Sequence, residues 1–499
     1  MPFFISFASV PTRDHVVNTS ESTIADKPRE PHVQQRSPSG EPLSIDRILE
    51  TGTTVVAFLI PIKLSFTYIA LFPLILLWLF KVGVEKIRLK VSDPAVATTR
   101  RALLVPLSFF LIAVGLHSLV GVDPVHSIRP FLSLVFFSLT LLFFLTCSDG
   151  ERSLRALVWG QTLAAFHSCL DAAYPIFFES IRAKNLFIGK VTESGQLSLV
   201  TIVALSLAWT AYQKAVAAPS ANGDRVPYKR FISLFAVTTL IWILLAFRND
   251  LQLSFLTSIC MVALAVVISL GSISLIQKKA PADKNNDYAV QAVTSLCLQL
   301  PLLCAALLAN LKRGPLLGVF VGGTIFLLFV SRRIARIFVG VAALIALTIE
   351  PIRERIAASI DHFFISGGRS TIWRIGGELA TKLPTGLGFH NSFMLREYAP
   401  EIPPELKHFH NNVLNILAEN GWLSLGIFLW LIGATLTMCF KDRANTLRIG
   451  IGCALISWQI AGLVEYNFGD SEVLLAVWTI LGTSFAVAAL KREHSPSLP

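Results

Sequence analysis

Long apolar runs separated by short polar connections recur along most of this 499-residue chain. A helix needs roughly 20 apolar residues to cross the hydrocarbon core of a bilayer, because each residue advances it by about 1.5 Å. Only 15% of the residues are charged, whereas soluble domains usually carry about 25%. A backbone in lipid must satisfy its own hydrogen bonds, so the runs predict helices. The chain is therefore expected to be an all-α polytopic membrane protein.

The runs divide the chain into about 12–14 transmembrane helices and one long polar loop. Candidate spans lie near 50–62, 64–81, 102–121, 129–147, 154–177, 194–213, 231–247, 251–276, 288–310, 315–330, 334–349, 412–438, 446–465 and 472–490. The expected organisation is a disordered cytoplasmic tail at 1–46, N-terminal spans at 47–349, a helical outer loop at 350–410, C-terminal spans at 411–490 and a cytoplasmic tail at 491–499. Pro61, Lys63 and Pro73 favour a short hairpin over 50–81.

Dense basic groups occupy alternate connections, which sets the orientation because cytoplasmic loops carry an excess of Lys and Arg. These groups are Lys81 to Arg101, Arg152 and Arg155, Lys214 to Arg230, Lys278 to Lys284, Arg332 to Arg336, Lys441 to Arg448, and Lys491 with Arg492. With fourteen spans they all fall on the cytoplasmic side. The loop at 350–410 and the connections at 121–128, 178–193, 248–250, 311–314 and 466–471 then face outward. In a bacterium this is an inner-membrane protein with the long loop in the periplasm.

A few basic residues lie on the outer side, against this orientation bias. Arg248 ends one span, Lys312 and Arg313 lie between two others, and Arg369 and Arg374 belong to the long loop. The planar arginine fork suits a phosphate or diphosphate, because it donates two hydrogen bonds at once. The alternative for each residue is a side chain that extends to lipid headgroups.

The outer loop reads as two amphipathic helices followed by a connector. Pro351 to Phe364 alternates charged and apolar residues, and Thr371 to Leu383 carries an apolar stripe at helical spacing, Ile372, Ile375, Leu379 and Leu383. Pro384 to Gly388 breaks the second helix. His410 then stands at the start of the next span, where a neutral imidazole can act as a general base. Three more histidines share the loop, His362, His390 and His408, and residue type does not choose among the four.

No nucleic-acid motif accompanies the formal net charge of +11, so nucleic acid is not an expected partner. The seven cysteines lack metal-ligand spacing and are interpreted as small apolar core residues. They are Cys147, Cys169, Cys260, Cys297, Cys304, Cys439 and Cys453. We expect neither a metal nor a cofactor.

Four short motifs in order resemble those of the O-antigen ligase and polymerase family. The run from His410 to Gly421 resembles the family's HN-x-x-L-x-x-L-x-E-x-G signature at the end of the outer loop. Lys312-Arg313-Gly314 resembles its SRG turn, with lysine in place of serine. Arg369 to Trp373 resembles its R-x-x-x-W element, and Pro384 to Gly388 its P-x-x-G-x-G turn. The resemblance covers about 300–440.

This resemblance implies a metal-independent glycosyltransferase with a GT-C-like helical membrane fold. Such enzymes move a glycan from undecaprenyl diphosphate to a sugar hydroxyl of lipid A–core, or to another growing carrier-linked chain. By position in these motifs, the resemblance implies that Arg313 and Arg369 bind the diphosphate and that His410 activates the acceptor. Lys312, Arg248 and Asn411 are further candidate substrate-binding residues.

Several alternatives stay open at this point. Arg248 competes with Arg313 for the membrane-end arginine. Glu419, about two turns beyond His410, faces either the site or a polar packing neighbour. The motifs do not separate ligase from polymerase. A transporter and a membrane scaffold are the candidates from other classes, although the notable charges gather at one surface rather than near the midplane.

Overall fold

The computed structural model describes residues 44–85, 94–173, 190–217, 228–246, 252–279, 284–310, 312–350, 352–354, 356–358, 369–398, 400 and 407–493. Within these ranges the regular structure is helical and no strand occurs, so the predicted all-α class is confirmed. The helices before the outer loop are α1 (Ile45–Leu59), α2 (Leu64–Glu85), α3 (Pro94–Val120), α4 (Pro124–Cys147), α5 (Gly150–Ala173), α7 (Lys190–Ala217), α8 (Tyr228–Ala246), α9 (Phe255–Lys279), α10 (Lys284–Thr294), the π-helical turn η1 (Ser295–Gln299), α11 (Leu300–Asn310), α12 (Arg313–Val330) and α13 (Arg332–Thr348). The remaining ones are α15 (Arg369–Lys382), η2 (Asn391–Met394), α16 (Leu395–Tyr398), α17 (Asn412–Lys441), α18 (Thr446–Gly462) and α19 (Ser471–Glu493).

Each predicted span coincides with one helix, or with the continuous run α10–η1–α11. Among the described residues, eight helices are long and apolar enough to cross a membrane, and a bent pair at 332–358 would make a ninth. The hairpin predicted over 50–81 is the pair α1–α2, joined at residues 60–63. The polytopic membrane class follows, and the tail predicted at 1–46 lies almost wholly outside the described residues.

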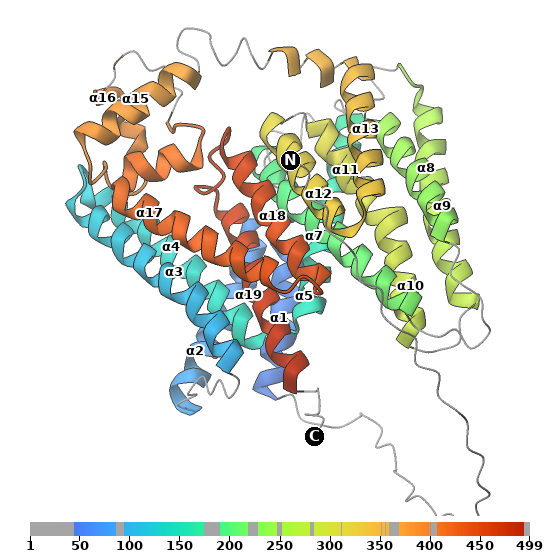
Figure 1. Ribbon diagram of the computed structural model, residues 1–499, viewed down its shortest axis with the longest axis horizontal. Coiled ribbons are helices and arrows are strands. Elements are labelled where there is room, and N and C mark those ends of the chain that lie inside the picture. Colours follow the sequence, from blue (N-terminus) through green and yellow to red (C-terminus); the bar gives the residue numbers. More distant parts are fainter. Residues whose placement is uncertain are drawn as a thin grey trace, which may run out of the picture. The chain divides into compact units, whose positions relative to one another are not determined.

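Helix α7 lies at the centre of the bundle, and 83% of its apolar membrane-spanning stretch is buried inside the protein. It packs against α18, α10, α12 and α5, while α19 packs on α4 and α17 on α3 (Figure 1). A close contact joins α12 to α18, where an added Cβ at Gly318 would lie 2.3 Å from the Ser457 carbonyl oxygen and one at Gly322 2.6 Å from that of Cys453. Small residues four apart let helix backbones approach in lipid. This contact brings the start of α12 beside the end of α18.

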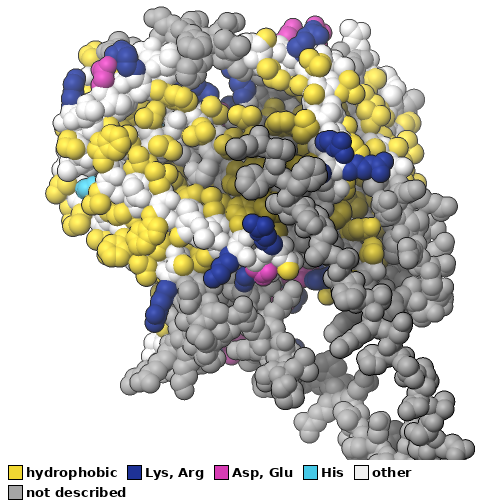
Figure 2. Space-filling model, viewed as in Figure 1, with side chains coloured by type: hydrophobic (Ala, Val, Ile, Leu, Met, Phe, Trp, Pro, Cys, Tyr) yellow, Lys and Arg dark blue, Asp and Glu magenta, His cyan; other side chains and the backbone are white. Residues whose placement is uncertain are grey.

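The two ends of the bundle differ in their polar contacts. At one end the predicted cytoplasmic groups meet, since Lys214 pairs with Glu151 at 2.9 Å and Thr446 donates to the Gln213 side chain at 2.9 Å. Hydrophobic side chains spread over much of the face drawn in Figure 2, and Lys and Arg lie in separate groups at its top, on its right side and in its lower part. The connections near 121, 314, 388 and 465 meet at the other end.

Helix α15 covers that other end beside the start of α17 (Figure 1). Its buried residues Ile372, Ile375 and Leu379 pack with Leu387 and Phe409 in a small apolar cluster. This is the stripe predicted from the periodicity, and α15 ends before Pro384 as predicted. The other predicted loop helix, 351–364, is helical at 352–354 and 356–358, and its remaining residues lie outside the described ranges.

Helix α17 is broken at Gly421, which has φ +72°. The turn after α15 fits into the break: Leu387 N–H donates to the Ala418 carbonyl and Gly388 N–H to that of Glu419, both at 2.8 Å. A Cβ on Gly421 would lie 2.3 Å from the Pro384 carbonyl oxygen. Two of the resembled motifs thus fit into each other, and the sequence reading of one uninterrupted span missed the break.

Candidate active site

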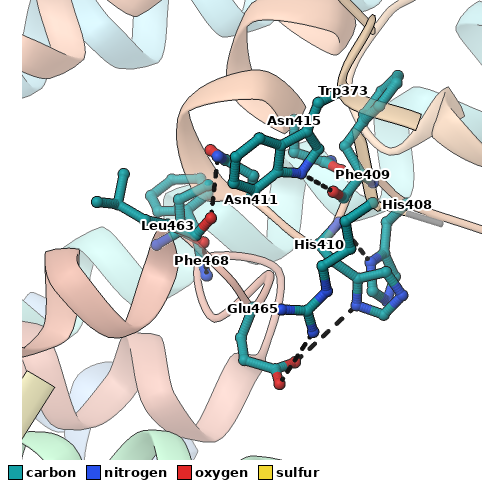
Figure 3. Close-up of polar contacts among 11 residues, drawn as sticks. Trp373, His408, Phe409, His410, Asn411, Asn415, Leu463, Glu465 and Phe468 are labelled. Carbon is teal, nitrogen blue, oxygen red and sulfur yellow. Dashed lines mark hydrogen bonds and ion pairs between the residues drawn. The ribbon is translucent and has the colours of Figure 1, made fainter. Parts of the chain in front are cut away.

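A single carboxylate, that of Glu465, contacts two of the predicted functional residues, of which His410 is labelled in Figure 3. Arg369 Nη2 is 3.7 Å from its Oε1, and His410 Nδ1 is 3.9 Å from its Oε2. Three elements supply the group: the first residue of α15, the connector just before α17, and the loop between α18 and α19. The Glu465 side chain is 11% exposed and those of Arg369 and His410 are 28% and 27% exposed. The Glu465 carboxylate is therefore poorly hydrated, whereas the side chains of Arg369 and His410 are more open to solvent.

The start of α12 is a fourth element that lies beside Glu465. Gly314 packs so tightly that a Cβ would lie 2.7 Å from Val464 and 3.3 Å from Glu465 Cγ. Lys312, the residue before α12, acts electrostatically on Glu465. Arg313 is the first residue of the helix and is partly exposed. The K-R-G turn thus lies beside the same carboxylate as Arg369 and His410.

The carboxyl of Glu465 is held ionised by its neighbours. Burial alone would raise its pKa, but the adjacent His410 imidazole and the charges of Lys312 and Arg369 outweigh burial, so the pKa lies below its usual range. One carboxylate facing several cations leaves a surplus of positive charge. Such a site is suited to an anion such as a phosphate.

The segment that carries His410 is fixed by hydrogen bonds on both sides. Phe409 N–H donates to Asn415 Oδ1 at 3.0 Å, and Trp373 Nε1 donates to the Phe409 carbonyl at 3.2 Å. His410 N–H donates to His408 Nδ1 at 3.3 Å, and His410 adopts φ +49°. Non-glycine residues rarely occupy this left-handed region, and where they do the surrounding contacts enforce it. The backbone that carries the imidazole is therefore held in one conformation.

Asn411 holds the start of α17 to the loop that carries Glu465. Its Oδ1 accepts from Leu414 N–H at 3.1 Å, which caps the helix, and its Nδ2 donates to the Leu463 carbonyl at 3.0 Å. Asn412 holds the other end of this loop, since its Oδ1 accepts from Phe468 N–H at 3.0 Å. The Asn411 amide is thus engaged within the protein and positions Glu465 opposite His410.

Glu419 lies deeper along α17 and is 1% exposed. Its Oε2 accepts from the Tyr466 hydroxyl at 3.4 Å. Burial, with the charge of Glu419 second, raises the pKa of Tyr466 well above its usual value, so the phenol stays protonated and remains a donor. Of the two readings left open for Glu419, the structure favours a polar packing partner, in contact with the residue next to Glu465.

The structure brings Arg369, His410 and Lys312 together around Glu465 and leaves Arg313 at the adjoining helix start. Arg248 lies outside the described residues, as does His362. In the part of the chain that the structure describes, no three His, Cys, Asp or Glu side chains are placed to hold a metal ion. Sequence reasoning missed Glu465, although a lone acidic residue at the outer end of the predicted span 446–465 was a usable signal.

Comparison with known proteins covers the same region. Residues 300–430 match the model of a family described as O-antigen ligase. A Rickettsia typhi protein provisionally named a polysaccharide ligase is 27% identical over 184 residues, which cover 33% of this chain and 45% of that protein. Its namesake in Rickettsia felis is 25% identical over 201 residues, 36% of this chain and 47% of that protein.

A third relative, from Rickettsia prowazekii and named in the same way, is 26% identical over 185 residues, 33% of this chain and 45% of that protein. The chain thus spans less than half the length of each of these curated relatives. The family model includes Lys312, Arg369 and His410 but ends before Glu465. The resemblance found from the four motifs is confirmed: residues 300–430 match the O-antigen ligase family model, and the three relatives are named as polysaccharide ligases.

Proposed function

We propose that this protein transfers a glycan from undecaprenyl diphosphate to a sugar hydroxyl of lipid A–core at the periplasmic face of the bacterial inner membrane. The observation that carries the proposal is the shared carboxylate: Arg369 and His410, distant in sequence, lie 3.7 Å and 3.9 Å from the two oxygens of Glu465. A phosphate-binding cation and a potential base are thereby adjacent. Transfer from a lipid diphosphate to a hydroxyl requires both groups.

His410 is the general base in this proposal. Its Nδ1 faces Glu465, so Nε2 is the nitrogen available to the acceptor. A carboxylate on one imidazole nitrogen fixes the ring and stabilises the imidazolium that forms when the other nitrogen takes a proton. The acceptor oxygen attacks the anomeric carbon, its proton passes to His410 Nε2, and the bond from that carbon to the diphosphate oxygen breaks. The electron pair leaves with the diphosphate.

Arg369, Lys312 and Arg313 neutralise the departing diphosphate. Their elements meet at the end of the bundle opposite the Lys214–Glu151 pair, which belongs to the predicted cytoplasmic clusters. The positive-inside bias then supports an outward-facing site. Cations placed where negative charge develops are a sufficient electrostatic aid for a leaving group that is already stable.

The test uses the full chain in proteoliposomes with carrier-linked glycan and lipid A–core. R369A and H410A are each expected to lower the transfer rate at least about a hundredfold, the range seen when a transition-state charge partner or a general base is removed. R374A is the matched control for the first, because Arg374 lies on the exposed face of α15, paired with Glu378 at 2.5 Å. H126A is the control for the second, since His126 is exposed and packs on Phe393. Transfer that survives in R369A and H410A would overturn the proposal.

A polymerase of the same family is the second candidate, because the motifs are common to both. The relatives' names favour the ligase. A deletion strain separates the two by its lipopolysaccharide pattern on a gel. Free core with accumulated carrier-linked polymer means ligase, whereas core carrying a single repeat unit means polymerase.

A further inference from the structure

His408 makes a local contact that fixes its own chemistry. Its Nδ1 accepts the backbone N–H of His410 at 3.3 Å. An Asn or Asp side chain that accepts the N–H two residues on closes the same kind of turn. The contact supports the left-handed backbone of His410 at φ +49°.

The contact also decides where the His408 proton lies. A nitrogen that accepts a hydrogen bond carries no proton, so a neutral ring bears its proton on Nε2. Burial, the neighbouring His410 and His390 lower the pKa of His408 to about 4 against the attraction of Glu465, so the ring is neutral near pH 7. Among the described residues no hydrogen-bond partner is found for Nε2. His408 therefore presents a neutral N–H donor.

This donor belongs to the charged group around Glu465. The His408 ring lies 4.2 Å from that of His410 and 5.5 Å from that of Tyr466, centroid to centroid. Glu465 acts electrostatically on His408 as well as being acted on by Lys312 and Arg369. His408 thus lies beside His410 and near Glu465 (Figure 3), the carboxylate on which Lys312 and Arg369 also act.

We propose that His408 is a binding residue for the donor lipid, whose Nε2–H donates to a non-bridging oxygen of the diphosphate. The proposal rests on the transferase function proposed above. A phosphate oxygen fits better than an acceptor hydroxyl, because the donor lies among cations and the acceptor needs a base. A neutral donor also holds the phosphate without adding a positive charge that would oppose protonation of His410.

The experiment compares H408N with H408A in the purified full chain. Asparagine places an acceptor oxygen where Nδ1 lies, so it keeps the turn at His410, but its amide does not reach the position of Nε2. Alanine loses both. Binding of undecaprenyl diphosphate in detergent micelles is measured by thermophoresis, thermal stability by scanning fluorimetry, and the KM for lipid A–core in the transfer assay.

Both variants are expected to bind undecaprenyl diphosphate roughly tenfold or more weakly, the usual loss when a hydrogen bond to a charged group is removed. Only H408A should lose thermal stability, and the acceptor KM should change less than twofold in H408N. Wild-type affinity in H408N would overturn the inference, as would a higher acceptor KM with unchanged diphosphate binding. If the wild-type chain itself fails to bind undecaprenyl diphosphate, the transferase proposal fails instead.

Discussion

Replacing Glu465 by glutamine removes the charge opposite His410 and leaves the shape of the side chain. At the observed 3.9 Å, a unit charge pair is worth about 4 kcal/mol at an effective dielectric constant of about 20. Because Arg369 and Lys312 also interact with this carboxylate, we assign about 3 kcal/mol of stabilisation to the His410 imidazolium. Since about 1.4 kcal/mol is tenfold in rate, E465Q should slow the chemical step roughly a hundredfold. Glu465→Asp, which keeps the charge, should lose less.

The assay is a single turnover of donor-loaded proteoliposomes after addition of excess acceptor, because this isolates the chemical step from product release. The donor affinity should not weaken, since Arg369 and Lys312 lose a competing carboxylate. Glu378→Gln is the control, because Glu378 forms an exposed pair with Arg374 on the same loop. A single-turnover rate in E465Q within threefold of wild type would refute the role of the carboxylate, and so would a loss confined to donor affinity.

Two further expectations rest on the geometry, and a third rests on the family resemblance. Gly421→Ala should lower the free energy of unfolding by about 2 kcal/mol or more, because φ +72° and the Pro384 carbonyl leave no room for Cβ. Gly426→Ala is the control, since a Cβ there would meet open space. Equal melting temperatures for the two variants would contradict the fit of the 384–388 turn into the break in α17. His408 stays neutral in the folded protein but takes up a proton in the unfolded chain, so the free energy of unfolding should fall by up to roughly 3 kcal/mol as pH drops from about 6.5 to about 4. H408N should lack this part of the pH dependence. Identical pH–stability curves for H408N and wild type would refute the lowered pKa of His408. Transfer should be unchanged by EDTA at millimolar concentration, and loss of activity that Mg²⁺ restores would refute the metal-free mechanism.

The membrane architecture could be predicted from the sequence because its determinants are local. A run of apolar residues meets the thickness of a bilayer without reference to any other part of the chain. The same holds for the stripe at Ile372, Ile375 and Leu379, since helical periodicity alone decides which side is buried. The broken helix at Gly421 differs, because the donors that replace its lost hydrogen bonds come from the turn at 384–388. Asn420-Gly421 is a turn signal in itself, but only the remote turn makes the break stable.

The candidate site was half predictable for the same reason. Arg369, Lys312 and His410 were singled out by charge on the outer side and by motif, which are properties of single segments. Their meeting at Glu465 depends on the tight contact of α12 with α18 and on Asn411 and Asn412 holding the loop after α18. These contacts link residues more than 50 positions apart and cannot be read from spacing. The sequence therefore indicated the chemistry but not the residue that organises it.

Under the proposed function, the Glu465 carboxylate lowers the affinity for the donor but speeds release of the product. The diphosphate must displace Glu465 from Arg369 and Lys312, which offsets part of its own attraction. The product is the same diphosphate, and an enzyme that held it by uncompensated cations would release it slowly. E465Q should therefore show stronger product inhibition by undecaprenyl diphosphate than wild type, by about tenfold for each 1.4 kcal/mol of lost competition. Inhibition constants measured in the transfer assay decide this: equal values in the two proteins would show that Glu465 serves His410 alone.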